Sequence, residues 1–166
     1  MFKNKLFSSG FTALELLVVL GIIGILMAIA LAGISFSRIK ARDSVRISDV
    51  KAIMLAVEQY RDVCREYPQD IYSTTVINNG CPTGISWENF MSDGTPIDPS
   101  GNQYLYIALQ QNGVCSQYHV AATLEQSDNK YLLSDDDFSS IGQPACLPGN
   151  AFNGSPSPDT VYDMMK

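Results

Sequence analysis

The sequence predicts an α+β fold, in which one long N-terminal α-helix packs on a small antiparallel β-sheet of about three to four strands. Three observations support this prediction. Residues 1–66 contain no proline and pass from an apolar block into an amphipathic pattern. Strand-like segments separated by turn formers follow at 103–133. Residues 134–166 are rich in glycine and proline, so we expect an irregular C-terminal tail.

The first element is an apolar block. Residues 16–34 are nineteen positions without a charge, proline, asparagine or glutamine. As a helix this block is about 28 Å long, close to the hydrocarbon thickness of a bilayer. We therefore expect residues 11–37 to form a hydrophobic membrane helix. Glu15 stands just before the block, where an isolated carboxylate costs a few kcal/mol in lipid.

Two simpler explanations of this block remain open. A cleaved signal peptide would have Lys3 and Lys5 ahead of the apolar stretch and a small-residue cleavage site at Ala28-Ile29-Ala30. A plain single-span anchor needs only the apolar length. Neither of them has a use for Glu15.

Residues 38–66 are predicted to continue the same helix in amphipathic form. Apolar residues recur there at spacings of three and four, with Arg46 among the charged residues assigned to other faces. The members of this stripe are Ile47, Val50, Ile53, Met54, Val57, Tyr60 and Cys64. Tyr67 precedes a proline and is biased away from helix, so we predict a helix from about Thr12 to Arg65.

The remaining residues, 67–166, are predicted to form a small globular domain. Residues 104–109, 117–124 and 130–133 are rich in β-branched and aromatic residues, which favour strands. Their sheet would pack on the apolar stripe of the helix. His119 lies on the opposite face of its strand, so we expect a partly exposed surface histidine.

The charge is distributed unevenly and limits the function. Residues 67–166 carry eleven acidic and two basic side chains, whereas 1–66 carry six acidic and nine basic ones. Direct nucleic-acid binding by the acidic half is disfavoured, because phosphate contacts need clustered lysine and arginine. The chain has no nucleophile elbow, phosphate loop or catalytic triad pattern, so we predict that it is not an enzyme.

Four cysteines lie after the apolar block, which favours an exported and oxidised domain. They are Cys64, Cys81, Cys115 and Cys146. Their spacing does not fit a zinc site, and three disulfide pairings are possible. We expect the local pairing, in which the second cysteine closes the loop after the helix and the fourth holds the tail on the sheet. Free buried thiols are the alternative.

The residues Gly10-Phe11-Thr12-Ala13-Leu14-Glu15, followed by the apolar block, resemble the class III signal of type IV pilins and type II secretion pseudopilins. The resemblance implies that Met1–Gly10 is a leader, cut after Gly10 by a prepilin peptidase. Phe11 would become the N-methylated first residue. Glu15 would be the fifth mature residue, which in this family pairs with the N-terminal amine of a neighbouring subunit. A pair with the amine of its own chain is the alternative.

The same resemblance implies a structural subunit of an extracytoplasmic filament. Its partners would be copies of itself, other pilin subunits, the peptidase and an assembly platform with an ATPase, and its precursor would wait in the inner membrane. A membrane-anchored binding module that never polymerises is the alternative. The basic residues after the apolar block favour the opposite orientation in the membrane. They are Arg38, Lys40, Arg42 and Arg46. The cysteines and the resemblance favour export of the domain.

Two further segments bear on this resemblance. Asp98-Pro99-Ser100-Gly101 fits a type I turn and resembles an element that leads into the first strand of major pseudopilins. Asp135, Asp136 and Asp137 are candidate calcium ligands, because calcium binds carboxylates in the pseudopilin branch of the family. A solvated acidic turn is the alternative, and no other cofactor is expected.

Overall fold

The computed structural model describes residues 10–73, 80–147 and 151–166, so the expected leader lies outside the described residues except for Gly10. The chain divides into two compact units, Met1–Arg38 and Ile39–Lys166. Helix α1, Ala13–Cys64, runs through both units. The predicted α+β class is confirmed.

The N-terminal half of α1 is exposed where its burial is described. Every residue from 10 to 38 whose burial is described is exposed, although nearly all are apolar from Leu16 onward. This helix is the one described element that is long and apolar enough to cross a membrane. An apolar helix without a polar face is stable only in lipid or among other apolar helices.

The second half of α1 buries the predicted stripe. Val50, Ile53 and Val57 are fully buried against the sheet, and Cys64 ends the helix. Arg65 follows with a positive φ of 66°, a conformation common at helix C-termini. The stripe extends further toward the N-terminus than predicted.

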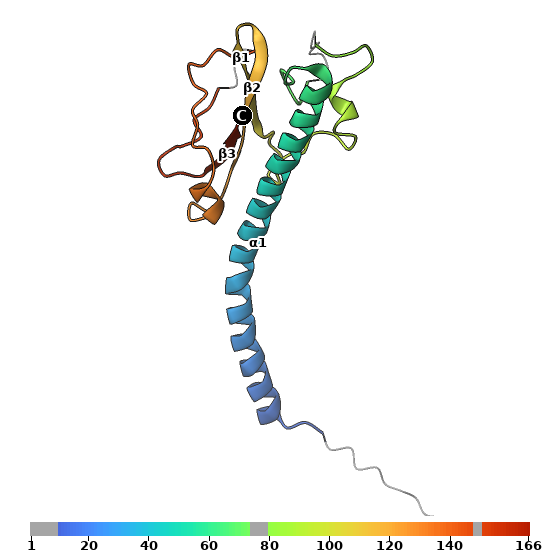
Figure 1. The fold of residues 1–166 in the computed structure, drawn as a ribbon. Helices are drawn as coiled ribbons and strands as arrows, with labels where there is room; N and C mark the ends of the chain where they lie inside the picture. Colours follow the sequence, from blue (N-terminus) through green and yellow to red (C-terminus); the bar gives the residue numbers. More distant parts are fainter. Residues whose placement is uncertain (1–9, 74–79, 148–150) are drawn as a thin grey trace, which may run out of the picture. The chain divides into compact units, whose positions relative to one another are not determined.

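Three antiparallel strands form the sheet, in the order β1 (Leu105–Gln111), β2 (Val114–Thr123) and β3 (Val161–Met165). They lie side by side next to the second half of α1 (Figure 1). The β1–β2 turn consists of Asn112 and Gly113, both with positive φ, as two-residue hairpin turns require.

Two predicted elements differ from the structure. Residues 130–133 form a short 3₁₀ helix, η2 (Lys130–Leu133), because the Asn129 side chain accepts a hydrogen bond from the Tyr131 amide. The third strand is β3, from the tail that was predicted to be irregular. It pairs with β2 so that Ala121 lies opposite Asp163.

The tail also covers the second face of the sheet. One core lies between α1 and the sheet, and a second contains Ile107 and Ala121 from the strands with Phe152 from the tail. Because both faces are covered, side chains of both registers of β2 are buried. The prediction that His119 is partly exposed is therefore wrong, since it is completely buried.

Candidate functional site

The start of α1 presents the predicted processing and assembly residues. Gly10 and Phe11 precede the helix and are exposed, as is Glu15. The Thr12 hydroxyl accepts a hydrogen bond from the Glu15 amide at 3.2 Å, which caps the helix. Glu15 therefore lies in the first helical turn, where a carboxylate interacts favourably with the helix dipole. The described residues offer its side chain no salt-bridge partner.

A buried charge cluster joins α1 to two parts of the domain. Arg46 is 4% exposed and Asp43 is fully buried, and their side chains are 2.8 Å apart. Arg46 also contacts Glu125 at 2.8 Å and makes two hydrogen bonds with Asp98. Asp43 accepts hydrogen bonds from the amides of Glu125 and Gln126 at 2.9 and 3.1 Å.

The cluster lowers the pKa of two of its carboxylates, Asp98 and Glu125. The hydrogen bonds from Arg46 lower the pKa of Asp98 to about 2. Hydrogen bonds from Arg42, and then from Arg46, lower the pKa of Glu125 to about 2. The contact with Asp98 in turn raises the pKa of Arg46. Asp98 is the first residue of the predicted turn, so the cluster fixes that turn on the helix.

The sequence interpretation assigned Arg46 to a different face of the helix from the apolar stripe, which is wrong. Asp43, Arg46 and Val50 follow one another at spacings of three and four, so both charged residues continue the buried stripe. A helical wheel extended by one turn would have found them.

Of the three predicted acidic ligands, two converge with a third carboxylate from the tail. One carboxylate oxygen from each of Asp135, Asp137 and Asp159 lies within 4.8 Å of the others. Asp136 is directed elsewhere, because its carboxylate accepts a hydrogen bond from the Met165 amide at 2.7 Å. Asp159 was missed, since it is distant in sequence and stands among prolines.

Asp135 has features suited to a bound cation. Its Oδ1 atom is buried and has no hydrogen-bond partner among the described residues. Burial raises the pKa of Asp135 to about 6. Clustered carboxylate oxygens are the ligands that calcium prefers. The donor set therefore fits calcium.

A buried histidine–aspartate pair holds the segment with the three consecutive aspartates, residues 135–137, which we call the acidic loop. His119 Nε2 donates to Asp163 at 2.7 Å, and neither side chain is exposed. Asp163 also accepts hydrogen bonds from the amides of Asp137 and Phe138, both at 3.0 Å. A Cβ at Gly154 would collide with the Asp163 carboxylate, which accounts for glycine there. Asp163 thus links β2, β3, the tail and the acidic loop.

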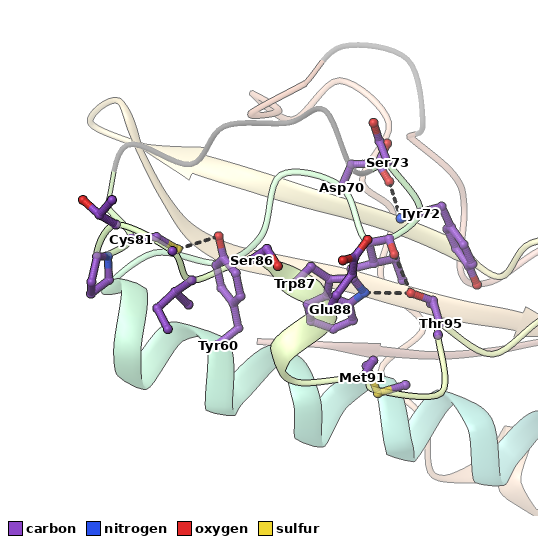
Figure 2. Close-up of a pocket in the computed structure, with 16 residues that line it drawn as sticks. Tyr60, Asp70, Tyr72, Ser73, Cys81, Ser86, Trp87, Glu88, Met91 and Thr95 are labelled. Carbon is purple, nitrogen blue, oxygen red and sulfur yellow. Dashed lines mark hydrogen bonds between the residues drawn. The ribbon is translucent and has the colours of Figure 1, made fainter.

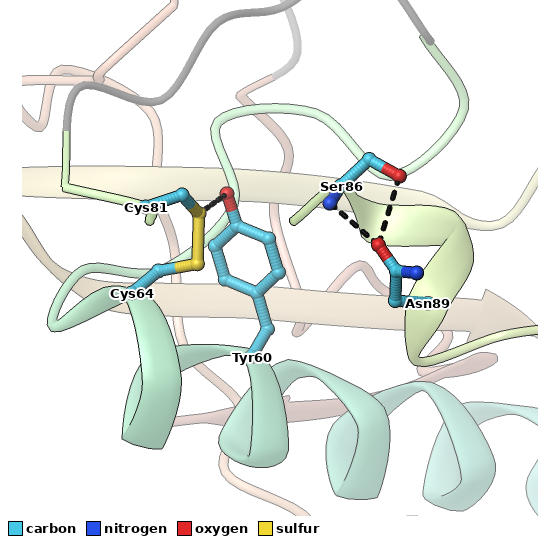
Figure 3. The surroundings of a disulfide bond; sticks show 5 residues. All are labelled: Tyr60, Cys64, Cys81, Ser86 and Asn89. Atoms are coloured by element: carbon cyan, nitrogen blue, oxygen red, sulfur yellow. Dashed lines mark hydrogen bonds between the residues drawn. A yellow bond between two sulfur atoms is a disulfide. The ribbon is translucent and has the colours of Figure 1, made fainter. Parts of the chain in front are cut away.

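The four cysteines lie as two local pairs. One disulfide joins Cys64 to Cys81 and the other joins Cys115 to Cys146. The first connects the end of α1 to the loop that follows (Figure 3). The second connects β2 to the tail, and the Cys146 amide donates to the Ala108 carbonyl of β1 at 2.9 Å.

The chain is similar to several curated proteins of one kind. The type II secretion system core protein G of Pseudomonas aeruginosa is 32% identical over 136 residues, which cover 78% of this chain and 90% of that protein. The core protein G of Aeromonas hydrophila is 31% identical over 110 residues, covering 63% and 76%. That of Escherichia coli is 27% identical over 108 residues, covering 63% and 74%. No protein-family model and no solved structure matches the chain.

Proposed function

The chain belongs to the type II secretion core protein G family, the major pseudopilins, and from this we propose that it polymerises through its N-terminal helix into an extracytoplasmic filament. The observation that carries the proposal is the N-terminal half of α1, whose described residues are exposed and almost entirely apolar. Lipid covers this surface in the precursor, and helices of neighbouring subunits cover it in the filament. The partners of assembly are copies of this chain and other pilin-like subunits.

The proposed route begins with the precursor in the inner membrane. A prepilin peptidase removes Met1–Gly10 and the new N-terminus, Phe11, is methylated. An assembly platform driven by a cytoplasmic ATPase then moves the apolar helix from lipid into the helical bundle of the filament. The type II secretion relatives favour a secretion filament over a surface pilus. A membrane-anchored module that never polymerises is disfavoured by Glu15, which costs free energy in lipid unless it gains a partner.

Processing gives the first test of this route. We expect the mature chain to begin at Phe11, and Gly10→Val to leave the precursor uncut. A Cβ at Gly10 would have no neighbouring atom within 4 Å in this chain, so the substitution leaves the fold intact. N-terminal sequencing and intact-mass measurement of membrane fractions check both results. A chain that begins at Leu31, after Ala28-Ile29-Ala30, would identify a conventional signal peptide and contradict the proposal.

We also propose that Asp135, Asp137 and Asp159 hold calcium and thereby fix the tail on the sheet. The supporting observation is the buried, unpartnered Oδ1 of Asp135. When bound, the cation would supply positive charge that offsets the mutual repulsion of the three close carboxylates. Asp163, held by His119, would keep the loop in place by accepting hydrogen bonds from the two backbone amides described above.

Thermal unfolding of the full chain in detergent tests calcium binding. With about 10 mM calcium and a Kd of about 0.1 mM, the free energy of unfolding should rise by about 2.7 kcal/mol over that in EDTA. Asp135→Asn should abolish this gain. Asp135 has a raised pKa near 6, so its charge opposes folding above that pH, and in EDTA the variant should be at least as stable as the wild type.

The matched control is Asp136→Asn, which removes one charge from the same loop but keeps an acceptor for the Met165 amide. This variant should retain the calcium gain. A wild-type chain that gains no stability from calcium would contradict the calcium proposal and leave the filament proposal intact.

A further inference from the structure

A cavity of about 580 Å³ lies beside the end of α1, lined by residues 70–73 and by residues between Cys81 and Thr95 (Figure 2). Its size falls within the range of pockets that enclose small ligands or short peptide segments. The chemically distinctive side chains of its lining are Tyr60, Asp70, Tyr72, Trp87, Glu88 and Met91. Neither the apolar N-terminal half of α1 nor the acidic residues 135–137 contribute to it.

Hydrogen bonds hold the aromatic wall of this pocket in place. Trp87 Nε1 donates to Thr95 Oγ1 at 2.7 Å, and that hydroxyl donates to the Ile71 carbonyl at 2.5 Å (Figure 2). Trp87 begins the short 3₁₀ helix η1, Trp87–Asn89. The Asn89 side chain accepts a hydrogen bond from the Ser86 amide at 2.7 Å, which fixes the start of η1 (Figure 3).

Packing also holds Tyr60 in place on the side of the pocket next to the disulfide. Tyr60 projects from α1 and is 1% exposed, and its ring centroid lies 6.1 Å from that of Trp87. The Tyr60 hydroxyl is 2.9 Å from Cys81 Sγ (Figure 3). Side chains held in this way lose little conformational entropy when a ligand binds, which favours affinity.

The charge of the lining favours a cationic ligand. Of the residues that the structure describes, sixteen line the pocket; they include two carboxylates, Asp70 and Glu88, and no lysine, arginine or histidine. Neither carboxylate has a salt-bridge partner within residues 10–73, 80–147 and 151–166. Aromatic faces attract cations, and they do so more strongly in partly desolvated sites. A cation beside Trp87 would therefore gain from both the ring and the carboxylates.

We propose that this pocket binds an arginine side chain presented by an extended peptide segment of another protein. A guanidinium is planar, stacks on aromatic rings and donates two hydrogen bonds at once to a carboxylate, which an ammonium cannot match. The volume accommodates the flanking residues as well as the arginine, so a peptide fills it better than a small free cation does. This inference does not depend on filament formation or on calcium.

The experiment uses the full chain in detergent and its single tryptophan, Trp87, as the reporter. The probe is the capped tripeptide acetyl-Ala-Arg-Leu-amide, and the matched probe replaces arginine with citrulline, which has nearly the same shape and no charge. We expect saturable change in tryptophan emission with the arginine peptide. The citrulline peptide should bind at least about tenfold more weakly, since loss of a charge-assisted contact costs about 1.4 kcal/mol or more. Guanidinium ion alone, as the free cation, should give no saturable change.

Two substitutions connect this binding to the pocket. Glu88→Gln and Asp70→Asn should each weaken binding of the arginine peptide about threefold to tenfold, with little effect on the citrulline peptide. Asn at position 70 keeps an acceptor for the Tyr72 amide, so the loop retains its shape. The control is Asp93→Asn, which removes the same charge from an exposed position outside the lining.

Three results would overturn the proposal. Equal affinity for the arginine and citrulline peptides would show that charge plays no part in binding. An effect of Asp93→Asn as large as that of Glu88→Gln would show that the attraction is non-specific. Binding of guanidinium as tight as that of the peptide would show that the ligand is a free cation.

Discussion

Filament assembly should fail when Glu15 is replaced by leucine. In the proposed filament the Glu15 carboxylate pairs with the Phe11 amine of a neighbouring subunit, inside an apolar helical bundle. Removing one partner of a buried ion pair costs about 3–5 kcal/mol, which is about a hundredfold or more in the equilibrium for adding a subunit. Membrane insertion and leader cleavage should survive, because the substitution removes a charge from lipid. Mature subunit should therefore accumulate in the membrane.

The amount of the chain in sheared filaments, relative to the amount in membranes, measures this effect. Glu15→Asp is the matched control, since it keeps the charge in the same helical turn and should retain part of the yield. A normal filament yield from Glu15→Leu at wild-type subunit levels would contradict the proposed intermolecular pair. It would favour the pair between Glu15 and the Phe11 amine of the same chain.

Replacing Arg46 by methionine should destabilise the domain more than any exposed charge substitution does. The change leaves the Asp43 carboxylate buried without its guanidinium and frees Asp98 from its ion pair. The free energy of unfolding should fall by about 3–5 kcal/mol, the usual result of breaking a buried pair. Chemical denaturation of the full chain in detergent measures it. Arg42→Met is the matched control, because the Arg42 side chain is 40% exposed and an exposed pair with Glu125 should contribute far less to stability.

The Arg46→Met variant should also lose less stability in acid than the wild type. The pKa values of Asp98 and Glu125 are about 2 in the folded chain, below ordinary values of 3.8 and 4.5. Their contribution to stability is therefore present above about pH 4.5 and is lost as the pH falls toward 2. In Arg46→Met the loss of stability over this interval should be smaller than in the wild type. Equal acid sensitivity of the two chains would show that the cluster does not govern it.

The long helix and the β1–β2 hairpin were predictable because their signals are local. The helix has a 3.6-residue period, no internal proline and a pre-proline residue just after its end. The hairpin has the Asn112-Gly113 pair that a tight turn requires. The predicted helix and the observed one, Ala13–Cys64, differ by one residue at each end.

The third strand could not be predicted in the same way. The segment 130–133 has the composition of a strand, but it is too short to distinguish a strand from a helical turn without its capping residue, Asn129. The apolar residues of strand β3 are interrupted by the charged Asp163, and the strand follows closely after prolines. Both features obscure the sequence pattern of a strand. It forms because β2 offers a free edge, and that is a property of the folded sheet.

The candidate sites show the same division. Glu15 and Gly10 can be recognised from the sequence because they stand next to an apolar segment. Asp135 and Asp137 can be recognised because they are close together in the chain. Asp159 reaches the acidic site only because the tail folds back over the sheet. The buried partners His119 and Asp163 are 44 residues apart, and no periodicity relates them. The pocket around Trp87 likewise brings together residues from 60 to 95 that no sequence pattern relates.

Recovery of filaments is the most direct test of the central claim that the chain is a polymerising subunit. The chain would be produced together with a type II secretion assembly system, and sheared material would be imaged and analysed by mass spectrometry. The account predicts long filaments composed mainly of this chain, each copy beginning at a methylated Phe11. A correctly processed chain that stays monomeric in the membrane, with no filament in the sheared fraction, would contradict it and favour the anchored binding module.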